Sequence, residues 1–393
     1  MSGPLIKKIK VLEMAHVISG PYAGMLLADL GADVIKVEMP GTGDYFRIWD
    51  GKDDAIRPSF AAYNRGKRSV TINVQTQSGQ ELYLRLASKV DVVLENFRPG
   101  TLERFGVGYE AIREENPDVI YCSLTGMGPT GPYKHRPTYD AIAQAMSGLW
   151  SQLTDMDRPE PVGPAISDQL SGLYAAYGIL GALVSRFLGG PGQKLDVSML
   201  GAGLAFQSTS VAERLMLGVI ADKLSRAHRS QSYAFVASDG LPFAVHLSTP
   251  QKFWQGLAET AGRPELVEDP RFKTKAGRVE NYEVLREILA GIFKSRPRAE
   301  WLAKLEERDV PSAPIYNVAE ALDDPQVQHL GMSETFGEGA RAIKLVGFPV
   351  AYSGSPCKPD LPVPYVGEHN ENIFGELGYN SSDLGRMKEE GAI

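Results

Sequence analysis

Cysteine is nearly absent from this 393-residue sequence, which contains only Cys122 and Cys357. Two cysteines cannot build the disulfide framework that stabilises small secreted domains. Neither lies in a CxxC pair or near a histidine-rich stretch, so no pattern typical of a zinc site is present. We therefore expect a protein of a reducing compartment, the cytoplasm, with no bound metal ion.

Long hydrophobic runs and an excess of basic residues are also missing. The longest uncharged stretch lies between Asp168 and Arg186 and is shorter than the ~20 residues of a membrane-spanning helix. The lysine-rich start precedes an apolar run that Glu13 interrupts, which argues against a signal peptide. The net charge of -7 disfavours nucleic acid as a partner, because a phosphate backbone attracts basic surfaces. We expect a soluble protein that binds neither membranes nor nucleic acids.

Several catalytic signatures are absent as well. The chain has no GxSxG nucleophile elbow, no GxxxxGKS/T phosphate loop and no HExxH metal motif. Gly126, Gly128 and Gly131 match GxGxxG after a strand pattern. However, Pro129 and Pro132 stand where a dinucleotide-binding fold begins its helix. We therefore expect no NAD or FAD and no other tightly bound cofactor.

The first half of the chain alternates between strand and helix patterns. Strands are predicted at 9–14, 32–38, 69–74, 91–96 and 118–124, with helices at 21–31, 79–90 and 109–115 between them. Apolar strands without strict alternation suit a parallel sheet with helices on both faces. The pattern predicts an α/β protein with a Rossmann-like doubly wound large domain over residues 1–198.

The second half has a different organisation. Small and apolar residues from Met199 to Ile220 predict a linker helix within 199–228. A hairpin turning at 238–240, followed by amphipathic helices, predicts a smaller α+β domain over 229–328. The C-terminal segment 329–393 returns to strands and Pro-rich loops and ends in a Glu-rich helix. We expect this segment to pack back on the large domain.

Basic residues recur in loops beside the predicted strands. They are Arg47, then Arg65, Lys67 and Arg68, then Arg98 and Arg104. Loops at the carboxyl ends of the strands carry the ligand site in doubly wound folds. In an acidic protein, such loops indicate a phosphate-bearing ligand, although solvated surface charges fit the sequence equally well.

The stretch PVGPAISDQLSG, residues 161–172, carries the main candidate for catalysis. A Pro-rich loop leads into a long apolar helix, with Ser167 as the expected N-cap and Asp168 in the first turn. The helix dipole favours negative charge there, so we expect Asp168 to stay ionised and reachable, as a nucleophile must be. Taken alone, such an aspartate also fits a simple helix cap.

Longer stretches carry a resemblance that spans nearly the whole chain. They are VLEMAHVISGPYAGMLLADLGADVIKVEMPGTGD, NRGKRSV, DVVLENFRPGTLERFGVGYE, YCSLTGMGPTGPY, YDAIAQAMSG, GQKLDVSML and VGEHNENIFGELGY. In this order they resemble the family III CoA-transferases, the CaiB/BaiF group. The resemblance implies an enzyme that moves CoA from an acyl-CoA donor to a small carboxylic acid, such as a dicarboxylate or a hydroxy acid.

The resemblance also implies roles for particular residues. The family's catalytic nucleophile is the aspartate before the long helix, which is Asp168 here. It would form a mixed anhydride and then an aspartyl-CoA thioester, which divides one difficult exchange into easier steps. CoA enters as a substrate, and the residues that the resemblance assigns to it are Arg65, Lys67, Arg68, Asn96, Phe97, Arg98 and Arg104.

The acceptor acid is left open by the sequence. The candidates for binding it are His16, Ile18 and Tyr139, with Arg47 and His228 as further side chains suited to a distal carboxylate. Oxalate-specific members have glutamine where Ile18 stands and arginine where Met39 stands. Formyl-CoA and oxalate are therefore poor candidates for the substrates.

Two other functions share parts of the pattern. α-Methylacyl-CoA racemases of the same superfamily need an acid and a base beside the substrate's α-carbon. They have a histidine where Tyr139 stands, and His135, in a Pro-flanked loop, is a poor substitute. A non-catalytic CoA-binding protein would use Asp168 only as a cap. The family's architecture implies an interlocked homodimer.

Overall fold

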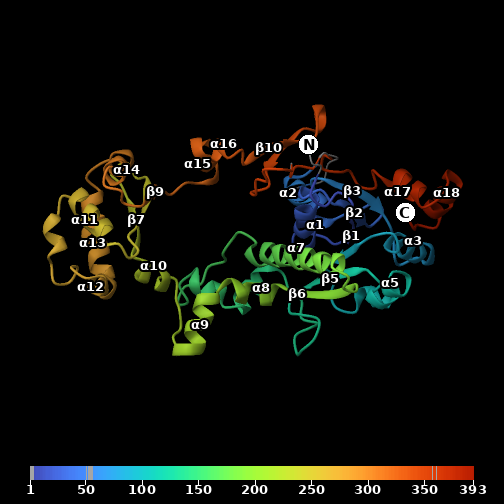
Figure 1. Ribbon diagram of the computed structural model, residues 1–393, viewed down its shortest axis with the longest axis horizontal. Coiled ribbons are helices and arrows are strands. Elements are labelled where there is room, and N and C mark those ends of the chain that lie inside the picture. The colour runs from blue at the N-terminus through green and yellow to red at the C-terminus, as the bar shows by residue number, and fades with distance from the viewer. Residues whose placement is uncertain (1–3, 50, 52–55, 356, 360) are drawn as a thin grey trace. The chain divides into compact units, whose positions relative to one another are not determined.

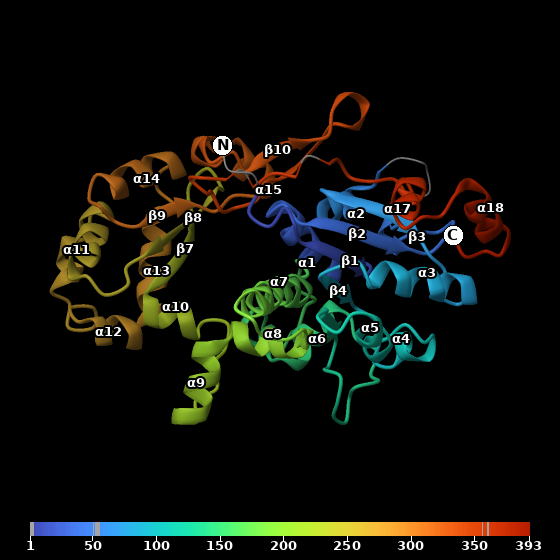
Figure 2. The same ribbon diagram turned by 45° about the vertical axis from the view of Figure 1, so that its right-hand side comes forward.

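The computed structural model describes residues 4–49, 51, 56–355, 357–359 and 361–393. The chain divides into two compact units. The first comprises Met1–Trp150, Pro161–Ser208 and His329–Ile393, and the second comprises Ser151–Glu160 and Thr209–Gln328. Figures 1 and 2 label the elements of both units. The chain thus leaves the first unit and returns to it with its C-terminal segment.

The first unit is built on a six-stranded parallel sheet in the order β3-β2-β1-β4-β5-β6. The strands are β1 (Lys10–Met14), β2 (Asp33–Glu38), β3 (Lys67–Thr71), β4 (Val92–Glu95), β5 (Ile120–Thr125) and β6 (Gln193–Ser198). The order reverses between β1 and β4, which makes this point the topological switch of a doubly wound sheet. The predicted α/β class is confirmed.

Helices cover both faces of this sheet (Figure 2). On one face lie α1 (Ser19–Asp29) and α7 (Ile166–Phe187), and on the other lie α3 (Gln77–Ala87), α4 (Thr101–Arg104) and α5 (Tyr109–Glu115). The unit also contains α2 (Pro58–Asn64), α6 (Asp140–Met146) and α8 (Met199–Phe206). Successive residues of β1 lie in different cores: Val11 packs with α1 and α7, and Leu12 packs with α3. Burial on both faces explains why the strands lack a polar alternation.

The helix α7 is the longest element near the site. With 22 residues and a mean hydropathy of 1.2, it is apolar enough to cross a membrane by length and composition. In this fold its inner face, with Ala175 and Ile179, packs against α1 and the sheet. Its outer face leaves Tyr177, Val184 and Phe187 exposed. The helix is therefore part of the core of the first unit.

The C-terminal segment packs on β3, at the edge of the sheet. It contains β10 (Ser333–Phe336), β11 (Ile343–Val346), α17 (Asn370–Glu376) and α18 (Ser381–Glu389). The Asn370 side chain accepts the backbone N–H of Thr71 at 2.8 Å and donates to its hydroxyl at 2.8 Å. Ile373 and Phe374 enter the same core as Leu12. The sequence predicts a single helix at the end of this segment, whereas the structure has two, α17 and α18.

The second unit has an antiparallel sheet in the order β7-β8-β9. Its strands are β7 (Ser232–Val236), β8 (Pro242–His246) and β9 (Ser312–Pro314). Its helices are α9 (Ser208–Leu217), α10 (Ser225–Ser230), α11 (Gln251–Thr260), α12 (Lys275–Glu280), α13 (Tyr282–Phe293), α14 (Arg298–Glu306), α15 (Val318–Asp323) and α16 (Pro325–His329). Its core is rich in aromatic residues, including Phe235, Trp254 and Phe293. The predicted smaller α+β unit and its hairpin are confirmed.

The single helix predicted from Met199 to Ile220 is wrong. The chain forms α8 and α9 instead, interrupted at Gln207. The buried Gln207 side chain donates to the backbone carbonyls of Ser147 (3.0 Å) and Gly203 (2.8 Å). These bonds join the last turn of α8 to the C-terminal end of α6 and fix the break there.

A network of buried charges lies below the loop that follows β1. Glu13 on β1 forms ion pairs with Lys36 (3.1 Å) and Lys67 (2.7 Å), and all three side chains are fully buried. Lys36 also pairs with Asp44 at 2.8 Å. Burial lowers the pKa of Lys67 to about 8, although Glu13 opposes the shift. Each charge therefore depends on its partners, because water cannot solvate it.

We expect Glu13→Gln to destabilise the protein by about 3–5 kcal/mol, because it leaves two buried ammonium groups without their shared carboxylate. Urea unfolding of the variant and wild type measures this loss. Glu110→Gln, which removes the exposed pair with Arg113, is the control and should cost less than about 1 kcal/mol. Similar losses in the two variants would contradict this account of the network.

Candidate active site

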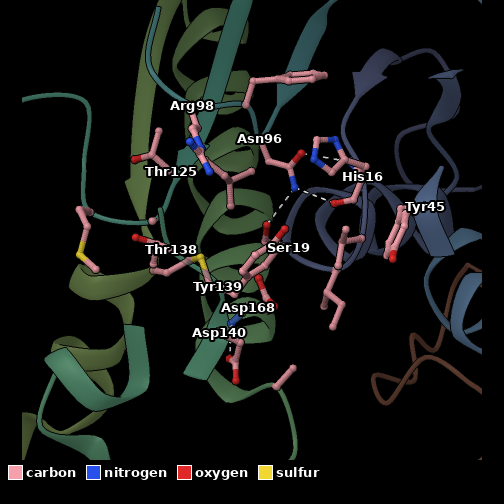
Figure 3. Close-up of a pocket in the computed structure, with 18 of the residues that line it drawn as sticks. His16, Ser19, Tyr45, Asn96, Arg98, Thr125, Thr138, Tyr139, Asp140 and Asp168 are labelled. Carbon is pink, nitrogen blue, oxygen red and sulfur yellow. Dashed lines mark hydrogen bonds between the residues drawn. The ribbon is translucent and has the colours of Figure 1, made fainter. Parts of the chain in front are cut away.

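A cavity of about 1030 Å³ lies at the carboxyl ends of the strands in the first unit. Its lining follows the strand order: Tyr45 and Phe46 after β2, His16 to Ser19 after β1, Asn96 to Arg98 after β4, and Thr125 to Met127 after β5. Tyr139 and Asp140 at the start of α6 and Asp168 on α7 also line it. Figure 3 shows Asp168 between Arg98 and Thr125 on one side and Tyr45 on the other. Doubly wound folds bind ligands at this switch point.

Asp140 caps the helix that carries Asp168. Its Oδ1 accepts the backbone N–H of Ser167 at 2.8 Å and of Asp168 at 3.1 Å. The expected N-cap at Ser167 is wrong, because the helix begins at Ile166 and Ser167 is buried inside its first turn. The cap comes from 27 residues upstream. Sequence proximity could not reveal it.

The carboxylate of Asp168 has no hydrogen-bond donor within the described part of the chain. Burial raises the pKa of Asp168 to about 7, and the negative charge of Asp140 adds to the shift. The expectation that the helix dipole keeps Asp168 ionised is therefore wrong near neutral pH, where part of the carboxyl is protonated. The N–H groups of Ser167 and Asp168 in the first turn of α7 are bonded to Asp140, which brings a charge of its own. Near neutral pH, Asp168 is present in both protonation states.

The Asn96 side chain joins the loops on the two sides of the switch point. Its Oδ1 accepts the backbone N–H of His16 at 3.0 Å, and its Nδ2 donates to the His16 carbonyl at 2.8 Å and to Ser19 Oγ at 3.2 Å. Figure 3 shows these bonds across the cavity wall. Burial lowers the pKa of His16, so its imidazole is neutral at physiological pH. Asn96 therefore sets the geometry of the wall from the β4 side.

Three cations line the cavity: Arg98, Lys134 and Arg136. The sequence predicted Arg98 as a site residue but missed the other two. Lys134 and Arg136 belong to the loop between β5 and α6, so the same signal of basic residues after a strand could have found them. Together the three make this part of the cavity attractive to an anionic ligand.

The chain matches the model of CoA-transferase family III over residues 6–370. It belongs to this family. Succinyl-CoA:glutarate CoA-transferase of Homo sapiens is 34% identical over 99% of this chain and 90% of its own length. Succinyl-CoA--D-citramalate CoA-transferase of Chloroflexus aurantiacus is 34% identical over 98% and 97%.

Solved structures agree with this family III assignment. The crystal structure of a CaiB/BaiF family protein from Brucella suis matches with a TM-score of 0.86 at 35% identity. The match covers 96% of this chain and 100% of that chain. The protein is therefore a family III CoA-transferase in both sequence and fold.

Four of the seven residues assigned to CoA lie outside the cavity of this CoA-transferase. Arg65 and Asp29 form a buried ion pair at 2.6 Å, and Lys67 is buried beside Glu13. Arg68 pairs with Asp33, also at 2.6 Å. Arg104 is exposed on α4 and does not line the cavity. Arg65, Lys67 and Arg68 differ from Arg98 in being paired with carboxylates of the protein, and a sequence pattern does not show such pairing.

Asn96, Phe97 and Arg98 do line the cavity, and so do the acceptor candidates His16, Ile18 and Tyr139. A second cavity of about 270 Å³ adjoins the first and shares His16, Tyr45 and Phe97 with it. The His16 and Phe97 rings meet edge to face at 5.1 Å between these cavities. The two adjoining cavities therefore give the transferase a long binding site at the carboxyl ends of the strands.

The two further acceptor candidates have other partners. Arg47 donates to both carboxylate oxygens of Glu38 at 2.7 Å and to the Pro364 carbonyl. His228 belongs to the second unit, where it lies 3.5 Å from Glu283. In the described residues no group of three or more His, Cys, Asp and Glu side chains is placed to hold a metal ion. Gly126 to Gly131 form a loop, and the next helix begins only at Asp140.

We expect Asp168→Asn to be more stable than wild type above neutral pH. A carboxyl whose pKa is raised in the folded state stabilises that state while it is protonated. This contribution is complete below the unfolded value of about 3.8 and is lost as the pH rises through about 7. Asparagine does not ionise, so the advantage of the variant should grow from pH 4 to pH 7 and then stay constant, at up to roughly 2 kcal/mol after allowance for partial exposure.

Urea unfolding at a series of pH values measures this difference. A stability difference between Asp168→Asn and wild type that does not change with pH would contradict the raised pKa of Asp168.

Proposed function

We propose that this CoA-transferase works through a covalent intermediate on Asp168. One observation carries the proposal: Asp140 takes the capping role, and the Asp168 carboxylate is left facing the cavity without a donor among the described residues. A carboxylate that only caps a helix is bonded to its N–H groups. A carboxylate that attacks an acyl carbon must instead be free of such bonds and poorly solvated.

The reaction balances without a redox partner. An Asp168 oxygen attacks the acyl carbon of the donor thioester, the C–S bond breaks, and CoA leaves as a thiolate. The thiolate attacks the Asp168 carbonyl carbon of the anhydride, and the donor acid departs with the bridging oxygen. The acceptor carboxylate then attacks the aspartyl-CoA thioester, and the same two steps run in reverse. Asp168 is restored as a carboxylate, and no net proton is consumed.

The environment of Asp168 supports this role. Desolvation raises the energy of the ionised carboxylate, which makes it a stronger nucleophile than an aspartate in water. Binding of an anionic CoA ester brings negative charge into the same cavity, and Arg98, Lys134 and Arg136 line it to offset that charge. We assign these cations, with Asn96 and Phe97, to CoA, and we withdraw Arg65, Lys67 and Arg68 because their partners are carboxylates of the protein.

The names of the relatives support a proposal for the donor and the acceptor. Several relatives are named for succinyl-CoA as donor and for glutarate, citramalate or mesaconate as acceptor. We propose succinyl-CoA and a small carboxylic acid for this chain as well, with His16, Ile18 and Tyr139 beside the acceptor. The residue at position 18 is apolar, so these contacts favour the carbon skeleton of the acid over its charge.

The two other functions lack support at this site. Racemisation needs a second proton-transfer group opposite Asp168, and His135 is exposed and outside the main cavity lining. In a purely CoA-binding protein Asp168 would cap the helix, but here Asp140 is the cap. Exchange of an α-proton in deuterated water without acceptor would favour the racemase.

We expect wild-type protein incubated briefly with succinyl-CoA to gain a CoA adduct on Asp168, seen by intact-protein mass and peptide mapping. Asp168→Ala should gain none, because it has no carboxylate to acylate. Asp155→Ala, which removes an exposed carboxylate, is the matched control and should react as wild type does. An adduct of equal yield in Asp168→Ala would rule out Asp168 as the nucleophile.

We also propose that the enzyme is an interlocked homodimer in the cytoplasm. The exposed apolar residues of α7, Tyr177, Val184 and Phe187, support a partner surface, as do Leu215 and Met216 on α9. Cys122 and Cys357 are both free, which agrees with a reducing compartment.

Sedimentation equilibrium at micromolar concentration should give about twice the chain mass of 42.8 kDa. Tyr177→Lys should weaken the assembly, because it places a charge in the apolar face of α7, whereas Glu110→Lys on α5 should not. A single species of 42.8 kDa would contradict the dimer.

A further inference from the structure

Val17 has an unusual backbone conformation in the wall of the cavity. Its φ is +68°, in the left-handed region that β-branched residues rarely adopt. The other described non-glycine residues with positive φ are Gln231, Ser248 and Asp309, and none of them lines this cavity. Such strain persists only where surrounding contacts impose it, and it occurs often at functional sites.

The contacts that impose it come from one buried ion pair. Asp44 Oδ1 accepts the Val17 N–H at 3.1 Å, and Asp44 Oδ2 pairs with Lys36 Nζ at 2.8 Å. Lys36 Nζ also donates to the Ala15 carbonyl at 2.7 Å. The pair therefore bonds to the backbone on both sides of His16. Asn96 holds His16 itself from the other side of the switch point.

The same carboxylate also reaches the neighbouring wall. Asp44 Oδ1 accepts the N–H of Phe46 at 3.0 Å, and the Asp44 N–H donates to Glu38 at 2.8 Å. Phe46 and Val17 both line the cavity and pack in one apolar cluster. Asp44 thus fixes the loop after β1 relative to the loop after β2.

We propose that Lys36 and Asp44 are a positioning pair for CoA transfer. They hold Val17 in its left-handed conformation and so keep His16, Val17 and Ile18 in place against the substrates. The inference rests on the proposed function, because it concerns the wall of the same site. A buried ion pair contributes little net stability compared with apolar residues of similar size. Bonds from both of its ends to the backbone of one strained loop are what a positioning role requires.

The test removes both charges at once, so that neither is left alone in the core. Lys36→Met with Asp44→Ala forms the pair-deleted enzyme, in which Glu13 keeps its ion pair with Lys67. We expect the pair-deleted enzyme to fold and to lose about 10-fold or more in kcat/KM with succinyl-CoA, since small misplacements near a reacting centre are costly.

Adding Val17→Gly to the pair-deleted enzyme should restore about 5-fold or more of this loss, because glycine adopts positive φ without strain. Val17→Gly alone, which also removes a side chain from the cavity wall, is the reference for the triple variant: deleting the pair should cost less kcat/KM in this background than in the wild-type background. A merely structural role of the pair would not make the loss depend on the residue at position 17.

The matched control deletes another ion pair that also bonds to backbone. Arg186→Met with Asp91→Ala removes a pair at the amino end of β4, where Asp91 accepts the Lys10 N–H at 2.8 Å. We expect this control to keep the wild-type kcat/KM.

Amide hydrogen exchange gives a readout that does not need activity. The His16 and Val17 amides should exchange faster in the pair-deleted enzyme and at the wild-type rate in the control. The proposal would be overturned if the His16 and Val17 amides exchanged at the wild-type rate in the pair-deleted enzyme. It would also be overturned if Val17→Gly restored none of the kcat/KM that the pair-deleted enzyme loses. A wild type that transferred no CoA would refute the proposed function, while the exchange rates would still decide whether the pair holds the loop.

Discussion

The chemistry proposed for this protein depends on one hydrogen-bonded cap, in which Asp140 accepts two first-turn N–H groups of the helix that carries Asp168. A helix terminus must satisfy these donors, and an aspartate in the first turn often does so itself. Here a residue on another helix satisfies them and leaves Asp168 directed into the cavity. The same contact places a second negative charge beside Asp168, which adds to the effect of burial on its pKa. The capping of this helix, the free carboxylate of Asp168 and its raised pKa thus share one cause.

The interior of the sheet below the site contains several buried charges. Glu13, Lys36 and Lys67 lie on three adjacent strands and are fully buried. Because buried ion pairs add little net stability compared with apolar residues of similar size, these charges fix the geometry of the interior more than they stabilise it. Through Asp44 this network reaches the loop after β1, and through Asn96 the strand β4 reaches the same loop. The cavity wall at the topological switch is therefore fixed from both directions, which suits a reaction that needs several acyl groups aligned in turn.

Much of the architecture could be predicted from sequence, because apolar strands and helical periodicity alternate along residues 9–125. Asp168 was found because it lies where a Pro-rich loop enters a long apolar helix, the position to which the family resemblance assigns the nucleophile. Its cap was not, since Asp140 is distant in sequence, and neither was the shifted pKa, which depends on burial. Arg65, Lys67 and Arg98 look alike in sequence, but only Arg98 lines the cavity. Carboxylates on neighbouring elements, Asp29 and Glu13, bind the other two, and only the folded chain brings these groups together.

The most direct test of the covalent pathway follows oxygen atoms. Wild-type enzyme is incubated with succinyl-CoA and succinate labelled with ¹⁸O in its carboxylates, and the peptide containing Asp168 is then weighed. The account predicts ¹⁸O in the Asp168 carboxylate, because the restored carboxylate keeps one oxygen from the acceptor acid. Asp140, in contact with the same helix turn, should remain unlabelled. Exchange of CoA between labelled and unlabelled succinate with no label in Asp168 would contradict the account, since CoA would then pass without an aspartyl intermediate.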